Sequence, residues 1–109
     1  MTLSNDFFEY VQDQLSPWSL IDKKRMFGVL GLYREGVMFG IIAKGLVYLK
    51  VDDSNKHKFL KAGSTLLKVF KNNREVPSYF EVPVDVLEDA EEFIDWAKES
   101  FAIQAIKVA

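Results

Sequence analysis

The chain has 109 residues, which suits one domain and is too short for two ordinary ones. Its residues are 49% hydrophobic and 14% aromatic, so it can bury a core without cross-links, and the lack of cysteine excludes disulfides, thiolate metal sites and a cysteine nucleophile. A formal net charge of −2 argues against a dedicated nucleic-acid binder, because such proteins usually carry a basic excess.

The first residues and the lengths of the apolar runs indicate where the protein works. The opening MTLSNDFFEY carries acids where a signal peptide has Lys or Arg before an apolar stretch. No apolar run approaches the ~20 residues needed to cross a bilayer. The lack of cysteine fits a reducing compartment. We therefore expect a single domain over residues 1–109, cytoplasmic and without membrane contact.

The first third of the chain predicts a helix followed by an extended segment. Phe7, Val11 and Leu15 recur at helical spacing, and Ser16-Pro17 closes that helix. Residues 21–27 then read as extended, with Lys23 and Arg25 on one side and Lys24 on the other.

The middle of the chain predicts an antiparallel meander. The apolar runs GLYR, VMFGIIA and LVYLKV are separated by Glu35-Gly36 and Lys44-Gly45, which favour two-residue hairpin loops. Loops of that length set Ala43 opposite Leu46 and Ile41 opposite Tyr48. They also set Gly31 opposite Gly40, which would make a flat patch where a helix can approach closely.

Alternation along the meander predicts two apolar faces. The face expected to accept the helices carries Val29, Gly31, Tyr33, Met38, Gly40, Ile42, Val47, Leu49 and Val51. The other carries Leu30, Leu32, Arg34, Val37, Phe39, Ile41, Ala43, Leu46, Tyr48 and Lys50. Helices on one side alone leave the second face exposed, so we expect a homodimer or a partner protein to cover it. The alternative is that the first helix or the C-terminal tail wraps around it.

The remaining segments complete an α+β pattern. Residues 56–63 predict a short helix ended by Gly63, 65–70 a strand, 71–77 a polar turn and 78–82 another strand. A helical turn around Val86 and a last helix over about 90–105 follow. The order α-β-β-β-α-β-β-α predicts two layers, with an antiparallel sheet of about five strands and helices packed mainly on one face.

Residue types that carry catalysis or bind metals are sparse. Gly28-Val29-Leu30-Gly31 has the spacing of a nucleotide-clamping glycine loop, but it is apolar and lies among strands. Asp52-Asp53-Ser54-Asn55 gathers oxygen ligands without the glycine and distal glutamate of a calcium loop, and helix capping is the favoured interpretation. We predict no catalytic residues, no metal and no cofactor. The less favoured alternative is a small-molecule enzyme that uses Asp52, Asp53 or His57.

Two basic segments raise an alternative function. Lys23, Lys24 and Arg25 are contiguous, and Ser54 to Arg74 contains six Lys or Arg and no acid. Direct DNA binding would use Lys23, Lys24, Arg25, Lys68, Lys71 and Arg74. Solvated surface, or pairing of these cations with the acidic last helix, is the simpler interpretation.

Several motifs resemble the N-terminal domain of the TfoX (Sxy) family. They are Arg25-Met26-Phe27-Gly28, then GLYREGVMFGIIAKGLVYLKVDD, and the late SYFEVP from Ser78 to Pro83. The likeness covers nearly the whole chain and identifies it as a single-domain short member. It implies a two-layer fold like that of secretion chaperones, with a tendency to dimerise.

The resemblance also implies a role. Named members regulate DNA-uptake competence and are thought to help a catabolite-activator-type transcription factor. We therefore expect a non-enzymatic regulator that binds a protein partner, with transcription machinery as the candidate, and whose DNA contact is indirect or weak. The candidate partner-binding residues are Arg25, Arg34, Phe39, Ile41, Tyr48 and Lys50.

Overall fold

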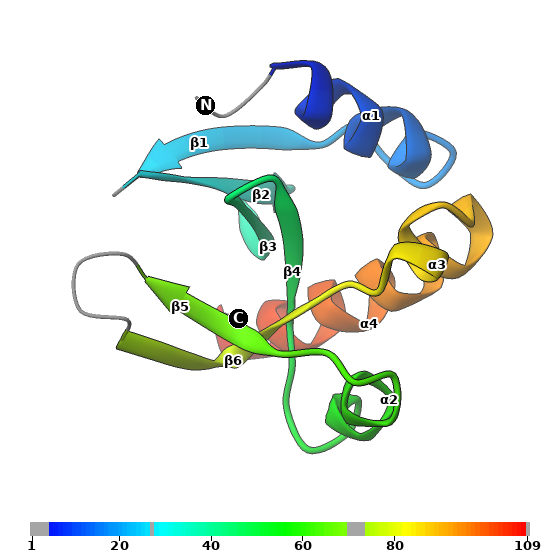
Figure 1. Cartoon of the computed structure of the whole chain (residues 1–109). Coiled ribbons are helices and arrows are strands. Elements are labelled where there is room, and N and C mark those ends of the chain that lie inside the picture. Colours follow the sequence, from blue (N-terminus) through cyan, green and yellow to red (C-terminus); the bar gives the residue numbers. More distant parts are fainter. Residues whose placement is uncertain (1–4, 27, 70–73, 109) are drawn as a thin grey trace.

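The computed structural model describes residues 5–26, 28–69 and 74–108 (Figure 1). Its elements follow the order α1 (Asn5–Leu15), β1 (Asp22–Met26), β2 (Val29–Arg34), β3 (Val37–Ala43), β4 (Leu46–Lys50), α2 (Lys56–Lys61), β5 (Leu66–Val69), β6 (Arg74–Glu81), α3 (Val84–Leu87) and α4 (Ala90–Val108). Among these described helices, even α4 lacks the unbroken apolar length that a bilayer requires.

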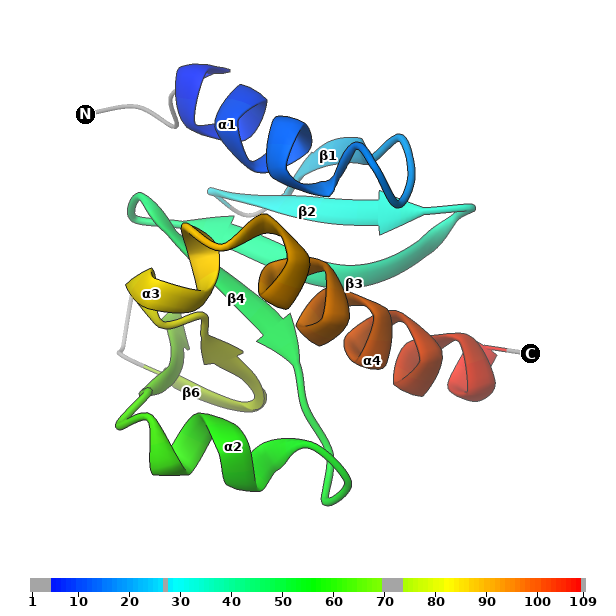
Figure 2. The ribbon, with the colours of Figure 1, turned by 90° about the vertical axis from the view of Figure 1, so that its right-hand side faces the viewer.

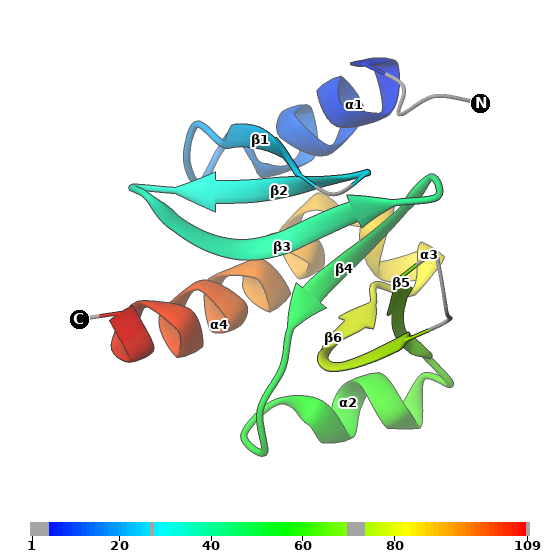
Figure 3. The same ribbon diagram turned by 90° about the vertical axis from the view of Figure 1, so that its left-hand side faces the viewer.

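The strands form one antiparallel sheet in the order β1-β2-β3-β4-β6-β5. Figure 2 shows α4 running across one side of β3 and β4, and Figure 3 shows the opposite side with the strands in front of α4. The predicted α+β class with helices mainly on one face is confirmed. The described sheet has six strands rather than about five, because β1 pairs with β2 along its whole length.

The second half of the sheet differs from the prediction at one strand. β6 begins at Arg74, whereas 71–77 was expected to be a turn, of which 71–73 lie outside the described residues. Polar side chains do not prevent pairing at this edge, because Glu75 lies opposite Lys68 and Val76 opposite Leu67 on β5.

Both hairpin loops of the meander have the predicted two residues. Glu35 and Gly36 have φ of 52° and 78°, and Lys44 and Gly45 have φ of 56° and 75°. Two consecutive positive φ values define the type I′ turn, whose twist matches that of the strands. The predicted pairing of β3 with β4 is confirmed, including Ala43 with Leu46 and Ile41 with Tyr48.

A β-bulge shifts the pairing of β2 with β3. Arg34↔Val37 and Tyr33↔Met38 pair as predicted, but the next pairs are Leu32↔Gly40 and Gly31↔Ile41. The predicted facing of Gly31 and Gly40 is therefore wrong. Phe39 is the extra residue, and its side chain joins the helix-side core.

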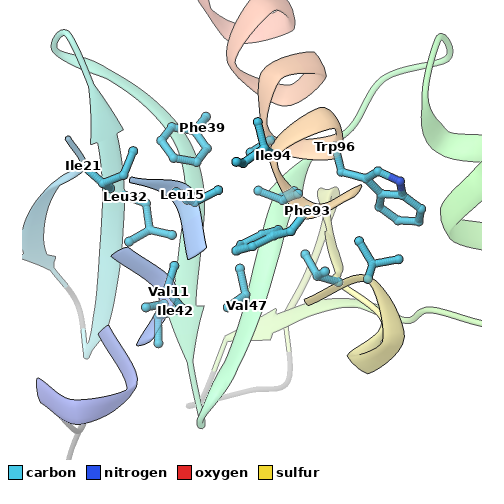
Figure 4. Close-up of a cluster of buried hydrophobic side chains, with 14 of the residues drawn as sticks. Val11, Leu15, Ile21, Leu32, Phe39, Ile42, Val47, Phe93, Ile94 and Trp96 are labelled. Carbon is cyan, nitrogen blue, oxygen red and sulfur yellow. The ribbon is translucent and has the colours of Figure 1, made fainter. Parts of the chain in front are cut away.

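The helix-side core lies between the sheet and the four helices, with Phe59 as the contribution of α2. Figure 4 shows the part of this core around β2, β3, β4 and α4. Val11 and Leu15 of α1 and Phe93 and Ala97 of α4 are all fully buried there. Because of the bulge, the meander supplies Leu30, Leu32, Phe39, Ile42, Val47, Leu49 and Val51 to this core, a set that mixes the two predicted faces.

The described buried polar side chains, those of Asn55 and Ser100, both donate hydrogen bonds to the same backbone oxygen. The Lys50 carbonyl accepts a hydrogen bond from Ser100 Oγ at 2.7 Å and another from Asn55 Nδ2 at 3.2 Å. Asn55 Oδ1 also accepts the Asp52 backbone N–H at 2.9 Å. These bonds fix the end of β4 to α4 and to the start of α2.

Candidate interaction site

The reverse face of the sheet, which no described helix covers, is apolar but not exposed. Its buried residues are Val29, Ile41, Ala43, Tyr48, Leu67 and Tyr79, with Met26, Met38 and Val76 packed against them. Figure 1 shows β1–β2 and β5–β6 projecting beyond β3 and β4 on this side, so the curled sheet surrounds its own side chains. The reverse face therefore forms a second small core.

The prediction of a large uncovered apolar face is wrong. Leu32 and Phe39 lie on the helix side and are fully buried, while Ile41 and Tyr48 are only 7% and 6% exposed. Among the apolar residues predicted for that face, Leu46 is the most accessible at 38% exposed, and Val37 is half-buried. Neither α1 nor the described part of the C-terminal helix supplies a residue to the cluster on the reverse face, which the strands of the curved sheet form by themselves.

Burial on the reverse face changes how its polar groups ionise. Burial, and then the charge of Tyr33, raise the pKa of Tyr79 to about 12. Burial, and then the Glu81 carboxylate, also raise the pKa of Tyr48. Lys50 Nζ lies 5.3 Å from the centre of the Tyr79 ring, and burial lowers its pKa. This face is therefore a packed, largely neutral surface with one lysine at its border.

A different group of side chains has the character of an interaction site. The Arg34 guanidinium carbon lies 4.9 Å from the centre of the Trp18 ring and 4.8 Å from that of Phe101. Trp18 in turn makes edge contacts with Phe39 and Phe101, at centroid distances of 5.5 and 5.8 Å. We call Trp18, Arg34, Phe39 and Phe101 the arginine–aromatic cluster.

Three separate segments build this cluster. Arg34 is the last residue of β2, immediately before the first hairpin turn. Trp18 is held at the end of α1 by a 2.9 Å hydrogen bond from its N–H to the Leu15 carbonyl. Phe101 projects from α4, which crosses the sheet at this point (Figure 2). A guanidinium packed against two neighbouring rings gains cation–π energy and loses rotational freedom.

The hydrogen-bonding capacity of Arg34 is only partly used. Its side chain is 22% exposed, and Nη1 lies 3.5 Å from Oε2 of the 70% exposed Glu35. That distance is long for a charge-assisted bond, which is usually 2.7–2.9 Å. Within the described part of the chain, Arg34 Nε is buried without a hydrogen-bond partner, and so is Gln104 Oε1. The guanidinium is thus rigid, charged and incompletely paired.

The structure separates the six predicted partner-binding residues into three places. Arg34 and Phe39 belong to the arginine–aromatic cluster, where Phe39 is a buried support and not a surface residue. Ile41, Tyr48 and Lys50 lie on the reverse face, and Arg25 is exposed on β1. Sequence reasoning overlooked Trp18, although a lone tryptophan in a short link between a helix and a strand is an unusual place for so large an apolar side chain.

The residues of the DNA-binding alternative do not gather on one surface. β1 and β5 form opposite edges of the sheet. Lys23, Lys24 and Arg25 lie on β1, whereas Lys68 lies on β5 and Arg74 on the adjacent strand β6. Lys23 Nζ lies 4.5 Å from the centre of the Phe8 ring of α1, on the helix side. Lys71, the remaining member of this set, lies outside the described residues.

The polar residues of the enzyme alternative do not form a catalytic grouping in the described part of the chain. The Asp52 carboxylate accepts hydrogen bonds from the Ser54 hydroxyl and backbone N–H, and these bonds lower its pKa. His57 is exposed on α2. Across residues 5–26, 28–69 and 74–108, no three His, Asp or Glu side chains come together in a way that would hold a metal ion.

The curled antiparallel sheet with helices on one side defines a small α+β domain. A family model described as the TfoX N-terminal domain matches residues 13–103, and the chain belongs to this family. Membership supports a regulatory domain of the competence-regulator type. No match was found among curated proteins.

Proposed function

We propose that this domain is a non-enzymatic regulator that binds a protein partner through the arginine–aromatic cluster. The observation that carries the proposal is the Arg34 side chain, packed against the neighbouring rings of Trp18 and Phe101 while 22% of its surface stays accessible. Arginine and tryptophan are enriched among the residues that dominate protein interfaces, and side chains that are already ordered lose little entropy on binding.

The surroundings of the cluster add apolar contact area. Leu20, two residues beyond Trp18, is 79% exposed. Asp22 pairs with Tyr33, so continuing that register sets Ile21 across from Arg34 and Leu20 just beyond it. Trp18 and Phe101 are themselves only partly buried. A charged anchor bordered by apolar surface suits a protein partner.

Site-specific photo-crosslinking in the native cell tests the proposal. A photoreactive amino acid at position 20 should capture a protein, whereas the same group at Leu60, 54% exposed on α2, should not. Arg34→Gln should abolish the adduct at position 20 without changing the abundance of the domain, and the matched Arg25→Gln on β1 should leave it intact. Adducts to nucleic acid, or equal capture at both positions, would contradict the proposal.

A further inference from the structure

The geometry of Arg34 points to the chemistry of its ligand. We propose that Arg34 anchors a carboxylate of an acidic peptide segment and that Glu35 of the same chain competes for the same position. The idea rests on the proposed function above and specifies the partner group that this site recognises. It depends on three features: how the guanidinium is held, which of its atoms are free, and where the neighbouring charges lie.

The two neighbouring rings and the burial of Nε limit where a ligand can reach the guanidinium. The Trp18 and Phe101 ring centres lie within 5 Å of its central carbon and next to each other, and Nε is buried, while Nη1 faces the exposed Glu35. The terminal edge with the two Nη groups is therefore the part of the side chain that a ligand can meet. That edge is planar and matches the two oxygens of a carboxylate in a paired, end-on arrangement.

Glu35 shows that a carboxylate reaches this edge but does not fill it. Its single contact is 3.5 Å long, and its side chain is 70% exposed. Glu35 is also the first of the two central residues of a type I′ turn, with φ of 52°, so the turn fixes its backbone. An incoming carboxylate that is free to align with both Nη groups displaces this loose contact.

The distribution of charge favours a peptide over nucleic acid. A phosphate backbone is bound by several cations spaced along it. The nearest cation along β1 and β2 is Lys23, which lies opposite Leu32, two residues from Arg34 and so roughly 7 Å along the strand. Its Nζ lies 4.5 Å from the centre of the Phe8 ring of α1, so this lysine is directed onto α1 and does not extend a row of cations from Arg34. Arg34 instead borders apolar surface from Trp18, Leu20 and Phe101, which fits an acidic residue flanked by apolar ones.

Titration with two matched capped peptides tests the inference. The probes are Ac-Ala-Leu-Glu-Leu-Ala-NH₂ and its twin with Gln in place of Glu, followed by amide and arginine Nε–H signals in NMR spectra. We expect shifts centred on Trp18, Arg34 and Phe101. The Glu peptide should bind about ten-fold more tightly than the twin, the lower end of what charge-assisted hydrogen bonds contribute.

Variants separate the guanidinium fork from simple charge. Arg34→Lys keeps the charge but not the fork and should remove most of the ten-fold preference. Arg25→Gln should retain it. Glu35→Gln removes the competitor without touching the core and should strengthen binding of the Glu peptide by about two- to five-fold, the scale of an exposed ion pair. Circular dichroism confirms that each variant is folded before it is titrated.

Four results would overturn the inference: equal binding of the two peptides, no binding at millimolar peptide, an unchanged affinity in Glu35→Gln, or an equal loss in Arg25→Gln. A short DNA duplex is included as a third probe, and tighter binding of it at the same signals would also overturn the idea. Crosslinking in cells does not depend on these peptides. An Arg34-dependent adduct without peptide selectivity would therefore refute only the claim that Arg34 recognises a carboxylate, and it would leave the proposed function standing. Peptide selectivity without any adduct would refute the proposed function.

Discussion

Replacing Gly40 by alanine tests how closely β3 approaches its neighbours. A Cβ atom added at Gly40 would lie 3.1 Å from the Tyr48 carbonyl oxygen, 3.2 Å from Leu49 Cδ2 and 3.4 Å from Leu32 Cδ1. The first of these is backbone in the neighbouring strand, and both leucines are fully buried in the helix-side core. None of the three can move away without disturbing the sheet or the core.

Gly31 provides the matched control in the adjacent strand. A Cβ there would lie 2.9 Å from Tyr33 Cε1, 3.0 Å from Met26 Cε and 3.0 Å from Met38 Sδ. These approaches are shorter than those at Gly40, but every atom is the far end of a flexible, partly buried side chain. Neither glycine has a positive φ, so backbone strain does not separate the two substitutions.

The expected free energies follow from that difference. Overpacking costs about 1–3 kcal/mol, and replacing glycine by alanine returns about 0.4–1 kcal/mol by restricting the unfolded chain. Gly40→Ala should therefore lower the free energy of unfolding by about 1–2 kcal/mol and the Tm by about 4–8 °C. Gly31→Ala should change the free energy of unfolding by less than about 0.5 kcal/mol, because side-chain movement offsets most of the overlap.

Urea denaturation followed by circular dichroism measures both variants, with thermal melts as a second readout. The decisive quantity is the difference between them in free energy of unfolding. A neutral Gly40→Ala, or a Gly31→Ala that is equally destabilising, would refute the placement of the bulge and of the two glycines on opposite faces.

Three further outcomes are expected. Asn55→Ala should cost about 2 kcal/mol of unfolding free energy in urea titrations and Ser100→Ala about 1 kcal/mol, because Asn55 makes two of the hydrogen bonds around Lys50 and Ser100 makes one; equal costs would contradict this. Burial raises the pKa of Tyr79 from 10.0 to about 12 in the folded state, so up to about 2.7 kcal/mol of stability that is present below pH 10 should be lost between pH 10 and 12. Alkaline melts of Tyr79→Phe should lack that loss. Gel-shift titrations with a DNA duplex at low salt should give a dissociation constant weaker than about 10 µM, since the described cations are divided between opposite edges of the sheet; tighter, salt-dependent retardation would favour the DNA alternative.

Local signals in the sequence were sufficient for the hairpins but not for the register between β2 and β3. Each turn depends on two adjacent residues, one of them glycine, so its geometry follows from those residues alone. The position of the bulge depends on which side chain of β3 packs into the helix-side core. Phe39 fills space beside Trp18 and α4, and no pattern within β3 distinguishes it from Gly40 as the extra residue.

The arginine–aromatic cluster and the buried reverse face were beyond sequence reasoning for a related reason. Trp18, Arg34 and Phe101 are far apart in the chain, and the path of α4 across the sheet brings them together. Alternation showed that the reverse face is apolar, but its burial comes from the curl of the whole sheet. Strand twist accumulates over many strand pairs, so the curvature of the whole sheet cannot be deduced from the residues of any single pair.

The position of Trp18 gives the domain a built-in optical reporter. The chain has two tryptophans, and Trp96 is 8% exposed against Phe59, with ring centres 4.7 Å apart. Replacing Trp96 by phenylalanine leaves a single indole, and that indole lies beside a fixed positive charge. Its emission will respond whenever the guanidinium is displaced or neutralised, so occupancy can be followed in dilute, unlabelled solution.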